Sequence, residues 1–138
     1  MLTAASKAYT IEIKCLLDAK TRNALSPNGR PHFMARSRAA KEVRDEAYVA
    51  TRLAKGWWRP MPGVKVGLSV DAAYDKAGLT DADNFWGGCM KPVRDGIMDC
   101  LAPDTIAARR DANVEMGELR LRSARKAPYF RVQIEVLE

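Results

Sequence analysis

The sequence predicts a single small α/β domain over residues 1–138, with helices packed on a mixed β-sheet. Apolar residues alternate with polar ones over residues 64–70 and again over 130–136, which is the pattern of half-buried strands. Between about Ala35 and Lys55, small apolar residues instead recur at spacings of three and four, which is typical of an amphipathic helix. The chain has no internal repeat and no linker, and its length suits one domain.

The first half of the chain is predicted to contain a strand, a loop and a long helix. Apolar side chains at every second position over residues 9–15 indicate a half-buried strand. Turn-forming residues over 26–32 indicate a loop. The helix that follows ends near Gly56, and we expect it to bury one apolar stripe, formed by Ala39, Val43, Ala47, Ala50 and Ala54.

The second half adds a strand over 64–70, a helix and two further strands. The helix is predicted from about Asn84 to Leu101. Gly87 and Gly88 lie within it and weaken it by up to about 1 kcal/mol each, so we expect a close packing contact or a local break there. Val114 begins the next strand, whose alternation changes phase near Gly117 and indicates a β-bulge.

Charge and composition favour a cytoplasmic protein that contacts polyanions. The formal net charge is +6 at pH 7, which favours a nucleic-acid partner, although a basic protein without such a partner is an alternative. The three cysteines show no CxxC spacing, which argues against a zinc site and against a disulfide framework. No apolar run approaches the roughly 20 residues of a membrane span. Residues 1–8 also lack the apolar core of a secretory signal, so we expect no membrane association.

The motif Asp81-Ala82-Asp83-Asn84 is the strongest candidate for chemistry. Two carboxylates at i and i+2 face the same way on an extended backbone, and they repel unless a cation lies between them. Oxygen ligands of this kind suit Mg²⁺. Capping of the following helix by Asp81 or Asp83 is the structural alternative, but capping accounts for only one of the two acids.

A second set of charged residues, Lys91, Asp95 and Asp99, is spaced by four and therefore shares one face of the predicted helix. An ion pair between Lys91 and Asp95 in this order contributes only about 0.2–0.5 kcal/mol, so stability is a weak reason for the stripe. A lysine beside a metal-bound carboxylate can instead hold a phosphate or stabilise developing negative charge.

Together these pieces resemble the RusA family of Holliday-junction resolvases. The family pattern is Asp-x-Asp-Asn, then a lysine, then Asp-Gly-Ile or a similar triplet, then an acidic pair. This chain has Asp-Ala-Asp-Asn at 81–84, Lys-Pro-Val-Arg-Asp-Gly-Ile at 91–97, and Asp104. Upstream, residues 25–33 (Leu-Ser-Pro-Asn-Gly-Arg-Pro-His-Phe) resemble the N-terminal segment of the family. The resemblance covers most of the chain.

The resemblance implies an endonuclease, often phage-encoded, that acts as a homodimer and cuts four-way DNA junctions symmetrically. It implies Mg²⁺ as the cofactor, for which Mn²⁺ can substitute. Asp81 and Asp83 match the first two metal ligands, and Lys91 matches the catalytic lysine.

The third metal ligand in the family comes from the later acidic pair, which reads Asp104-Thr105 in this chain. We expect Asp104 to take this role, and Asp99 is the alternative. The expected catalytic residues are therefore Asp81, Asp83, Lys91 and Asp104. We expect Asn84, Asp95 and Asp99 to orient these residues without binding the metal themselves.

Basic residues cluster in two segments of the chain. The first lies in the loop and long helix, and we expect DNA contacts there from Asn28, Arg30, Arg36, Arg38 and Lys41. The second runs from Arg109 to Arg131. Phosphate contacts supply most of the non-specific affinity for DNA. Acidic residues are interleaved with the first cluster, so a solvated helix face is an alternative.

Two other functions fit the same residues. A non-catalytic protein that binds DNA junctions is favoured by Thr105 at the place of an acid, and it would bind without cleaving. A small-molecule phosphohydrolase could use the same acidic cluster, but its activity would not show the steep salt dependence of DNA binding.

Overall fold

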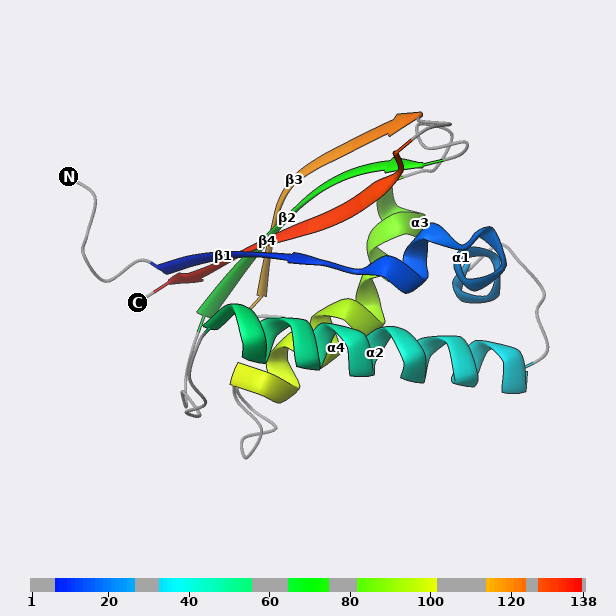
Figure 1. Cartoon of the computed structure of the whole chain (residues 1–138), viewed down its shortest axis with the longest axis horizontal. Coiled ribbons are helices and arrows are strands. Elements are labelled where there is room, and N and C mark those ends of the chain that lie inside the picture. The colour runs from blue at the N-terminus through cyan, green and yellow to red at the C-terminus, as the bar shows by residue number, and fades with distance from the viewer. Residues whose placement is uncertain are drawn as a thin grey trace.

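Four strands form one mixed sheet, β1 (Lys7–Glu12), β2 (Lys65–Tyr74), β3 (Val114–Ser123) and β4 (Tyr129–Leu137), in the spatial order β1-β4-β2-β3 (Figure 1). β4 runs antiparallel to both β1 and β2, and β3 runs parallel to β2. The computed structural model describes residues 7–26, 33–55, 65–74, 82–101, 114–123 and 127–137. At residues 7, 55, 82–84 and 137 it describes the backbone alone.

Helices cover one face of this sheet. The 3₁₀ helix η1 (Lys14–Leu17), α1 (Ala19–Leu25) and α2 (Phe33–Lys55) follow β1, while α3 (Ala82–Gly87) and α4 (Met90–Leu101) follow β2. α2 and α4 lie on the same side of the sheet, and no described helix covers the opposite face (Figure 1). None of the described helices is both long and apolar enough to cross a membrane. The predicted small α/β domain with a mixed sheet is confirmed.

The core lies between the sheet and the helices. Val66, Leu68 and Val70 of β2 are buried, as the alternating pattern predicts, and so are Val132 and Ile134 of β4. These side chains pack in one cluster with the buried face of α4. Burial of apolar surface at this interface is the main source of stability for the fold.

α2 packs against α4 through a stripe of small side chains. Ala39, Val43 and Ala47 are buried as predicted. The prediction for Ala54 is wrong, because it is exposed and Thr51 is buried instead. The Thr51 hydroxyl donates to the Ala47 carbonyl oxygen at 2.7 Å, so its polar group is satisfied inside the interface.

Gly96 brings the two helices into backbone contact. A Cβ atom at this position would collide with the Arg44 carbonyl oxygen and would lie 2.8 Å from the Ala47 Cβ. Only a residue without a side chain allows this approach. Gly96 therefore fixes the separation of α2 and α4, and with it the space between their exposed edges.

The predicted helix from Asn84 to Leu101 is divided in two, and the local break expected at Gly87 and Gly88 is confirmed, because a turn at Gly88 and Cys89 separates α3 from α4. Pro92 supplies the main physical reason. In a continuous helix its ring would clash with the carbonyl of Gly88, and its missing N–H would break the ladder. As the third residue of α4, it falls in the first turn, where N–H groups have no intrahelical partner.

The prediction of a strand through Cys15 is also wrong, because the chain enters η1 at Lys14. The Glu46 carboxylate of α2 accepts the backbone N–H groups of Lys14 at 2.6 Å and Cys15 at 3.0 Å. α1 follows at once, and the Asp18 side chain caps it by accepting the Lys20 N–H. A contact with α2 thus ends the strand, and sequence alternation alone could not reveal it.

The predicted bulge near Gly117 is confirmed. The pairing of β2 with β3 shifts between Leu68 and Val70, which lie opposite Met116 and Leu119. The Ser69 hydroxyl accepts the Glu118 N–H at 3.2 Å, and a Cβ atom at Gly117 would collide with that hydroxyl. Glycine at 117 therefore leaves space for Ser69 to satisfy a backbone donor that the bulge removes from the ladder.

The face of the sheet opposite α2 and α4 carries a row of alternating charges. Glu12, Arg131, Asp71 and Arg120 are partners in register across β1, β4, β2 and β3. Arg131 lies 3.6 Å from Glu12, and Arg122 lies 3.8 Å from Asp71. The described part of the second basic segment is thus a surface of mixed charge, in which Arg120, Arg122 and Arg131 each have a carboxylate neighbour.

Burial of Cys89 gives the fold a testable dependence on alkaline pH. Burial, only partly offset by the charge of Arg22, raises the pKa of the Cys89 thiol from its ordinary value of 9.0 to about 11. The unfolded chain therefore loses this proton at lower pH than the folded chain, so stability falls as pH rises from about 9 to about 11. We expect urea unfolding to show a smaller fall over this interval in Cys89→Ala than in the wild type. An equal fall in both proteins would contradict the assignment to Cys89.

Candidate functional site

The acidic motif begins α3. Asp83 is the second residue of this helix and Asn84 the third, while Asp81 and Asp104 lie outside the described residues. The prediction of an extended backbone is therefore wrong at Asp83. A carboxylate in the first turn of a helix is favoured by the positive end of the helix dipole. For Asp83 and Asn84 the structure describes the backbone and not the side chains.

Two aromatic residues fix α3 to the sheet. Phe85 is buried, and its ring stacks on Phe130 of β4 with centroids 5.8 Å apart. Trp86 meets the Phe85 ring edge-on at 5.7 Å and packs against the core. The backbone that carries Asp83 is thereby attached to the centre of the sheet.

Lys91 and Asp95 lie on the exposed side of α4. The Lys91 Nζ is 3.9 Å from the Asp95 Oδ2, so the predicted i,i+4 pair is present but long. Their side chains are 60% and 39% exposed, and such a pair contributes little to stability. The ammonium of Lys91 therefore remains accessible to a ligand.

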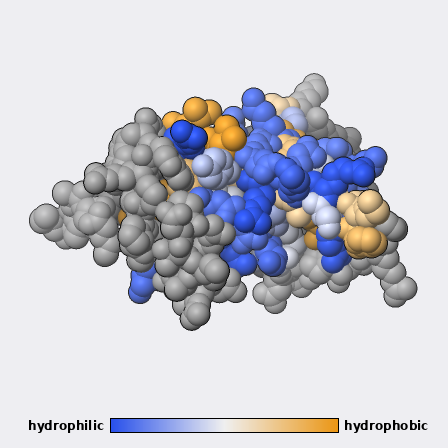
Figure 2. Space-filling view, turned by 90° about the horizontal axis from the view of Figure 1, so that it is seen from below, coloured by the Kyte–Doolittle hydropathy of each residue, from blue (hydrophilic) through white to orange (hydrophobic). Residues whose placement is uncertain are grey.

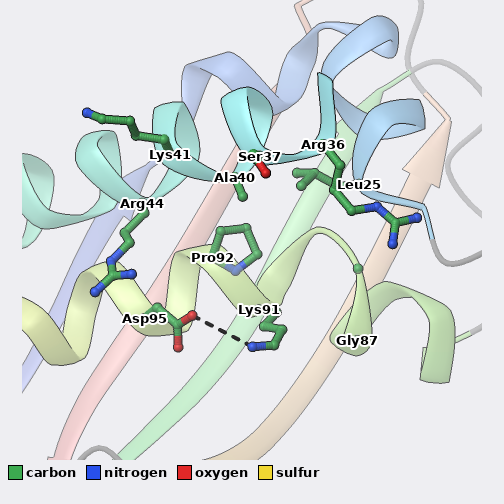
Figure 3. Close-up of a pocket in the computed structure, with 11 residues that line it drawn as sticks. Leu25, Arg36, Ser37, Ala40, Lys41, Arg44, Gly87, Lys91, Pro92 and Asp95 are labelled. Carbon is green, nitrogen blue, oxygen red and sulfur yellow. Dashed lines mark ion pairs between the residues drawn. The ribbon is translucent and has the colours of Figure 1, made fainter. Parts of the chain in front are cut away.

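A groove of about 550 Å³ lies between α2 and α4, next to the end of α1 (Figure 3). Its floor is apolar, and its rim carries four cationic side chains and one carboxylate. Figure 3 shows that the lining side chains come from both helices. The lining residues are Leu25, Arg36, Ser37, Ala40, Lys41, Arg44, Gly87, Gly88, Lys91, Pro92 and Asp95.

Arg44 is the most constrained cation of the groove. Its Nε and Nη2 donate to the two carboxylate oxygens of Asp99 on α4, at 2.5 and 3.0 Å. Hydrogen bonding to Asp99, reinforced by the charges of Asp95 and Asp45, raises the pKa of Arg44 above its ordinary value. This two-pronged pair joins α2 to α4 beside the groove and fixes the orientation of the guanidinium.

The other two cations of α2 have different environments. The ammonium of Lys41 lies 2.8 Å from Asp45, and in Figure 3 it points away from the groove, so Lys41 lines the groove mainly with its stem. The Nη2 of Arg36 donates to the Ser26 carbonyl oxygen at 3.1 Å, which is an uncharged partner. Among the residues that the structure describes, no carboxylate pairs with Arg36, so Arg36 brings an uncompensated positive charge to the groove.

Hydrophilic side chains dominate the described surface of the helix-covered side, and hydrophobic groups appear there in small separate patches (Figure 2). The exposed large apolar residues of α2 lie near its two ends, at Phe33, Met34, Val49 and Leu53. The stretch of α2 from Arg36 to Arg44, which lines the groove, is therefore polar at its rim.

The structure brings together only part of the residues predicted from sequence. Arg36 and Lys41, predicted as DNA contacts, line the same groove as Lys91 and Asp95. Arg38 is exposed on α2 but does not line the groove. Asn28 and Arg30 lie outside the described residues.

The predicted metal site stays a prediction. Among the residues whose side chains are described, no three His, Cys, Asp or Glu side chains form a group that could hold a metal ion. Asp81, Asp104 and the Asp83 carboxylate fall outside that set. Asp99, the alternative third ligand, is described, and both its carboxylate oxygens accept hydrogen bonds from Arg44.

Sequence reasoning missed the contribution of Arg44, Leu25 and Pro92 to the groove. Arg44 and Asp99 are 55 positions apart, so the spacing of nearby residues cannot predict their contact. The one available signal was Gly96 on the predicted second helix, because a glycine on a buried helix face permits close approach of another helix.

Comparisons with known proteins identify no family for the chain. A protein of Xylella fastidiosa (strain Temecula1), described as an uncharacterized protein, is 40% identical over 83 residues. The match covers 58% of this chain and 52% of that protein, so the chain spans about half the length of this relative. No family model and no solved structure matches the chain.

Proposed function

We propose that this chain is a RusA-like endonuclease that resolves four-way DNA junctions by Mg²⁺-dependent hydrolysis of phosphodiester bonds. The observation that carries the proposal is the α2–α4 groove. It places Arg36 and Arg44 across from Lys91, and α3, which carries Asp83, ends at the groove with Gly87. A cationic groove next to the helix that carries Asp83 is compatible with metal-assisted cleavage of a nucleic acid.

Asp81, Asp83 and Asp104 are the proposed ligands of Mg²⁺. Their carboxylate oxygens are the donor type that this ion prefers. When bound, Mg²⁺ would polarise the scissile phosphate and lower the pKa of a coordinated water. The double hydrogen bond from Arg44 to Asp99 occupies the carboxylate of the alternative ligand, which favours Asp104 for the third position.

Lys91 is the proposed partner of the scissile phosphate. Its contact with Asp95 is long and exposed, so a phosphate oxygen can replace that carboxylate at small cost. The ammonium then neutralises charge that develops on the phosphorane-like transition state. In this scheme Asp95 orients Lys91 before DNA binds, and Asn84 orients a metal-bound carboxylate or water.

A homodimer would place two such sites on opposing strands of the junction. Two-fold symmetry of the protein would match the approximate two-fold symmetry of a four-way junction, which accounts for paired nicks. The substrate also implies where the protein acts, in a bacterial cytoplasm that contains recombining DNA.

Arg36→Gln is expected to weaken junction binding and to lower its salt dependence. Loss of one phosphate contact reduces the slope of log affinity against log salt by about 1. The measurement is binding of a labelled four-way junction between low and moderate salt, in EDTA so that no cleavage occurs. Arg52→Gln is the matched control, because Arg52 is exposed on the same helix, carries the same charge and does not line the groove.

If log affinity fell with log salt at the same slope in Arg36→Gln and in the wild type, the groove would not be part of the DNA-binding surface. Equal affinity of the wild type for the junction and for a linear duplex of the same length would argue against recognition of branched DNA.

A further inference from the structure

We infer that the α2–α4 groove receives one unstacked nucleotide of the bound DNA, with its base on the apolar floor and its phosphate at the cationic rim. The inference rests on the proposed function and adds the way in which one strand is held near the cleavage site. Three features of the groove carry it: its floor, its rim and its size.

The floor offers an apolar surface of the kind that a base needs after it leaves the helix stack. Ala40 is half-buried and accessible to a ligand, whereas Leu25 and Pro92 beside it are buried and offer little surface (Figure 3). Unstacking a base costs free energy, and contact with apolar side chains returns part of that cost.

The rim offers cations on opposite sides of this floor. Arg36 and Arg44 extend from α2, and Lys91 extends from α4 (Figure 3). The guanidinium of Arg44 uses one edge for Asp99, and its remaining N–H groups can donate to a phosphate without moving. A phosphate on either side of the base thus finds a cation.

Two polar groups at the rim can contact the edge of a base. Asp95 accepts hydrogen bonds, and a carboxylate accepts readily from the amino group of cytosine. The Ser37 hydroxyl both donates and accepts, so it tolerates any base. The site therefore suits a nucleotide with a bias toward bases that carry an exocyclic amine.

The size of the groove excludes a duplex but admits one nucleotide. Its volume of about 550 Å³ falls within the roughly 300–1,000 Å³ of sites for small ligands. A B-DNA duplex is wider than its roughly 12 Å major groove, so it cannot enter a cavity of this volume between two packed helices. A duplex can lie across the rim, and only a splayed nucleotide can enter.

The test uses 2-aminopurine, a base whose fluorescence rises when it leaves the stack, placed at the centre of a four-way junction. With the full chain in EDTA, we expect a several-fold rise in fluorescence on binding. Gly87→Leu adds a side chain at the groove where a new Cβ meets nothing within 4 Å, and Ala40→Leu fills the floor itself. Both variants keep all charges, and at protein concentrations that saturate the junction we expect them to lose the rise. Arg52→Gln is expected to keep it.

The outcomes separate this inference from the proposed function. Tight junction binding by the wild type with no rise, or with a rise that survives in both groove-filling variants, would overturn the inference and leave the proposed function standing. Failure of the wild type to bind the junction would overturn both. Displacement of the junction by a glutamate-rich amphipathic peptide, without any rise on junction binding, would assign the groove to a protein partner and overturn the inference.

Discussion

Lys91→Met is expected to lower the rate of junction cleavage by roughly 10²–10³-fold, the usual effect of removing one donor that stabilises transition-state charge. The substitution keeps the length of the side chain and removes only the ammonium. Because Lys91 is 60% exposed and its contact with Asp95 is 3.9 Å long, the folded state should lose little stability. The measurement is single-turnover cleavage with saturating protein, so that a modest change in affinity does not enter the rate.

Lys65→Met is the matched control for this experiment. Lys65 is also an exposed lysine, but it begins β2 and does not line the groove. We expect its cleavage rate to equal that of the wild type. A wild-type rate in Lys91→Met would exclude this lysine from the chemistry, whereas equal losses in both variants would indicate a general effect of charge.

Phe130→Ala is expected to destabilise the fold by about 3–5 kcal/mol, the range for removal of a buried phenylalanine. The Phe130 ring is only 1% exposed, and it stacks between Tyr74 at 6.3 Å and Phe85 at 5.8 Å. Since small domains are stable by only about 5–15 kcal/mol, the loss is a large part of the total. Urea unfolding at neutral pH measures it directly.

Phe33→Ala provides the comparison for Phe130→Ala. Phe33 is 71% exposed at the start of α2, so removal of its ring should change stability far less. A loss below about 1 kcal/mol for Phe130→Ala would contradict the placement of this ring at the centre of the core. Phe130 also supports Phe85 on α3, so we expect Phe130→Ala to lower cleavage as well as stability.

Elements with a strong local pattern were predictable from sequence. β2 alternates up to Ala72, and β4 alternates from Phe130 to Val136, because one face of each strand packs on helices. α2 repeats small residues because one stripe packs on α4. The bulge at Gly117 was visible for the same reason, since a change of phase marks an inserted residue. These signals depend on near neighbours in the chain, which sequence reading captures.

Features that depend on distant contacts were not predictable in this way. The strand β1 ends where Glu46 of α2 accepts the N–H groups of Lys14 and Cys15, which are more than 30 positions away. The break before α4, by contrast, has a local cause in Pro92 and was expected from the glycines at 87 and 88. The groove itself exists only because Gly96 and the Arg44–Asp99 pair set two helices side by side.

Sequence analysis therefore predicted which residue types form the candidate site better than it predicted how they are arranged in space. Lys91 and Asp95 were placed on one helix face by spacing alone, and the structure agrees. Arg36 was predicted from charge, but its position opposite Lys91 required the packing of α2 on α4. Asp83 was expected on an extended backbone and lies in α3, because the helix begins earlier than its apolar pattern suggests.

The most direct test of the proposed function is cleavage of a labelled synthetic four-way junction by the wild type and by Asp83→Asn, with Mg²⁺ or with EDTA. Asp83→Asn removes one charge at a position already helical and keeps the size of the side chain. The proposal predicts paired symmetric nicks for the wild type with Mg²⁺, and none with EDTA or in the variant. Tight and selective junction binding with no product in either Mg²⁺ or Mn²⁺ would contradict it and would identify a junction-binding protein without nuclease activity.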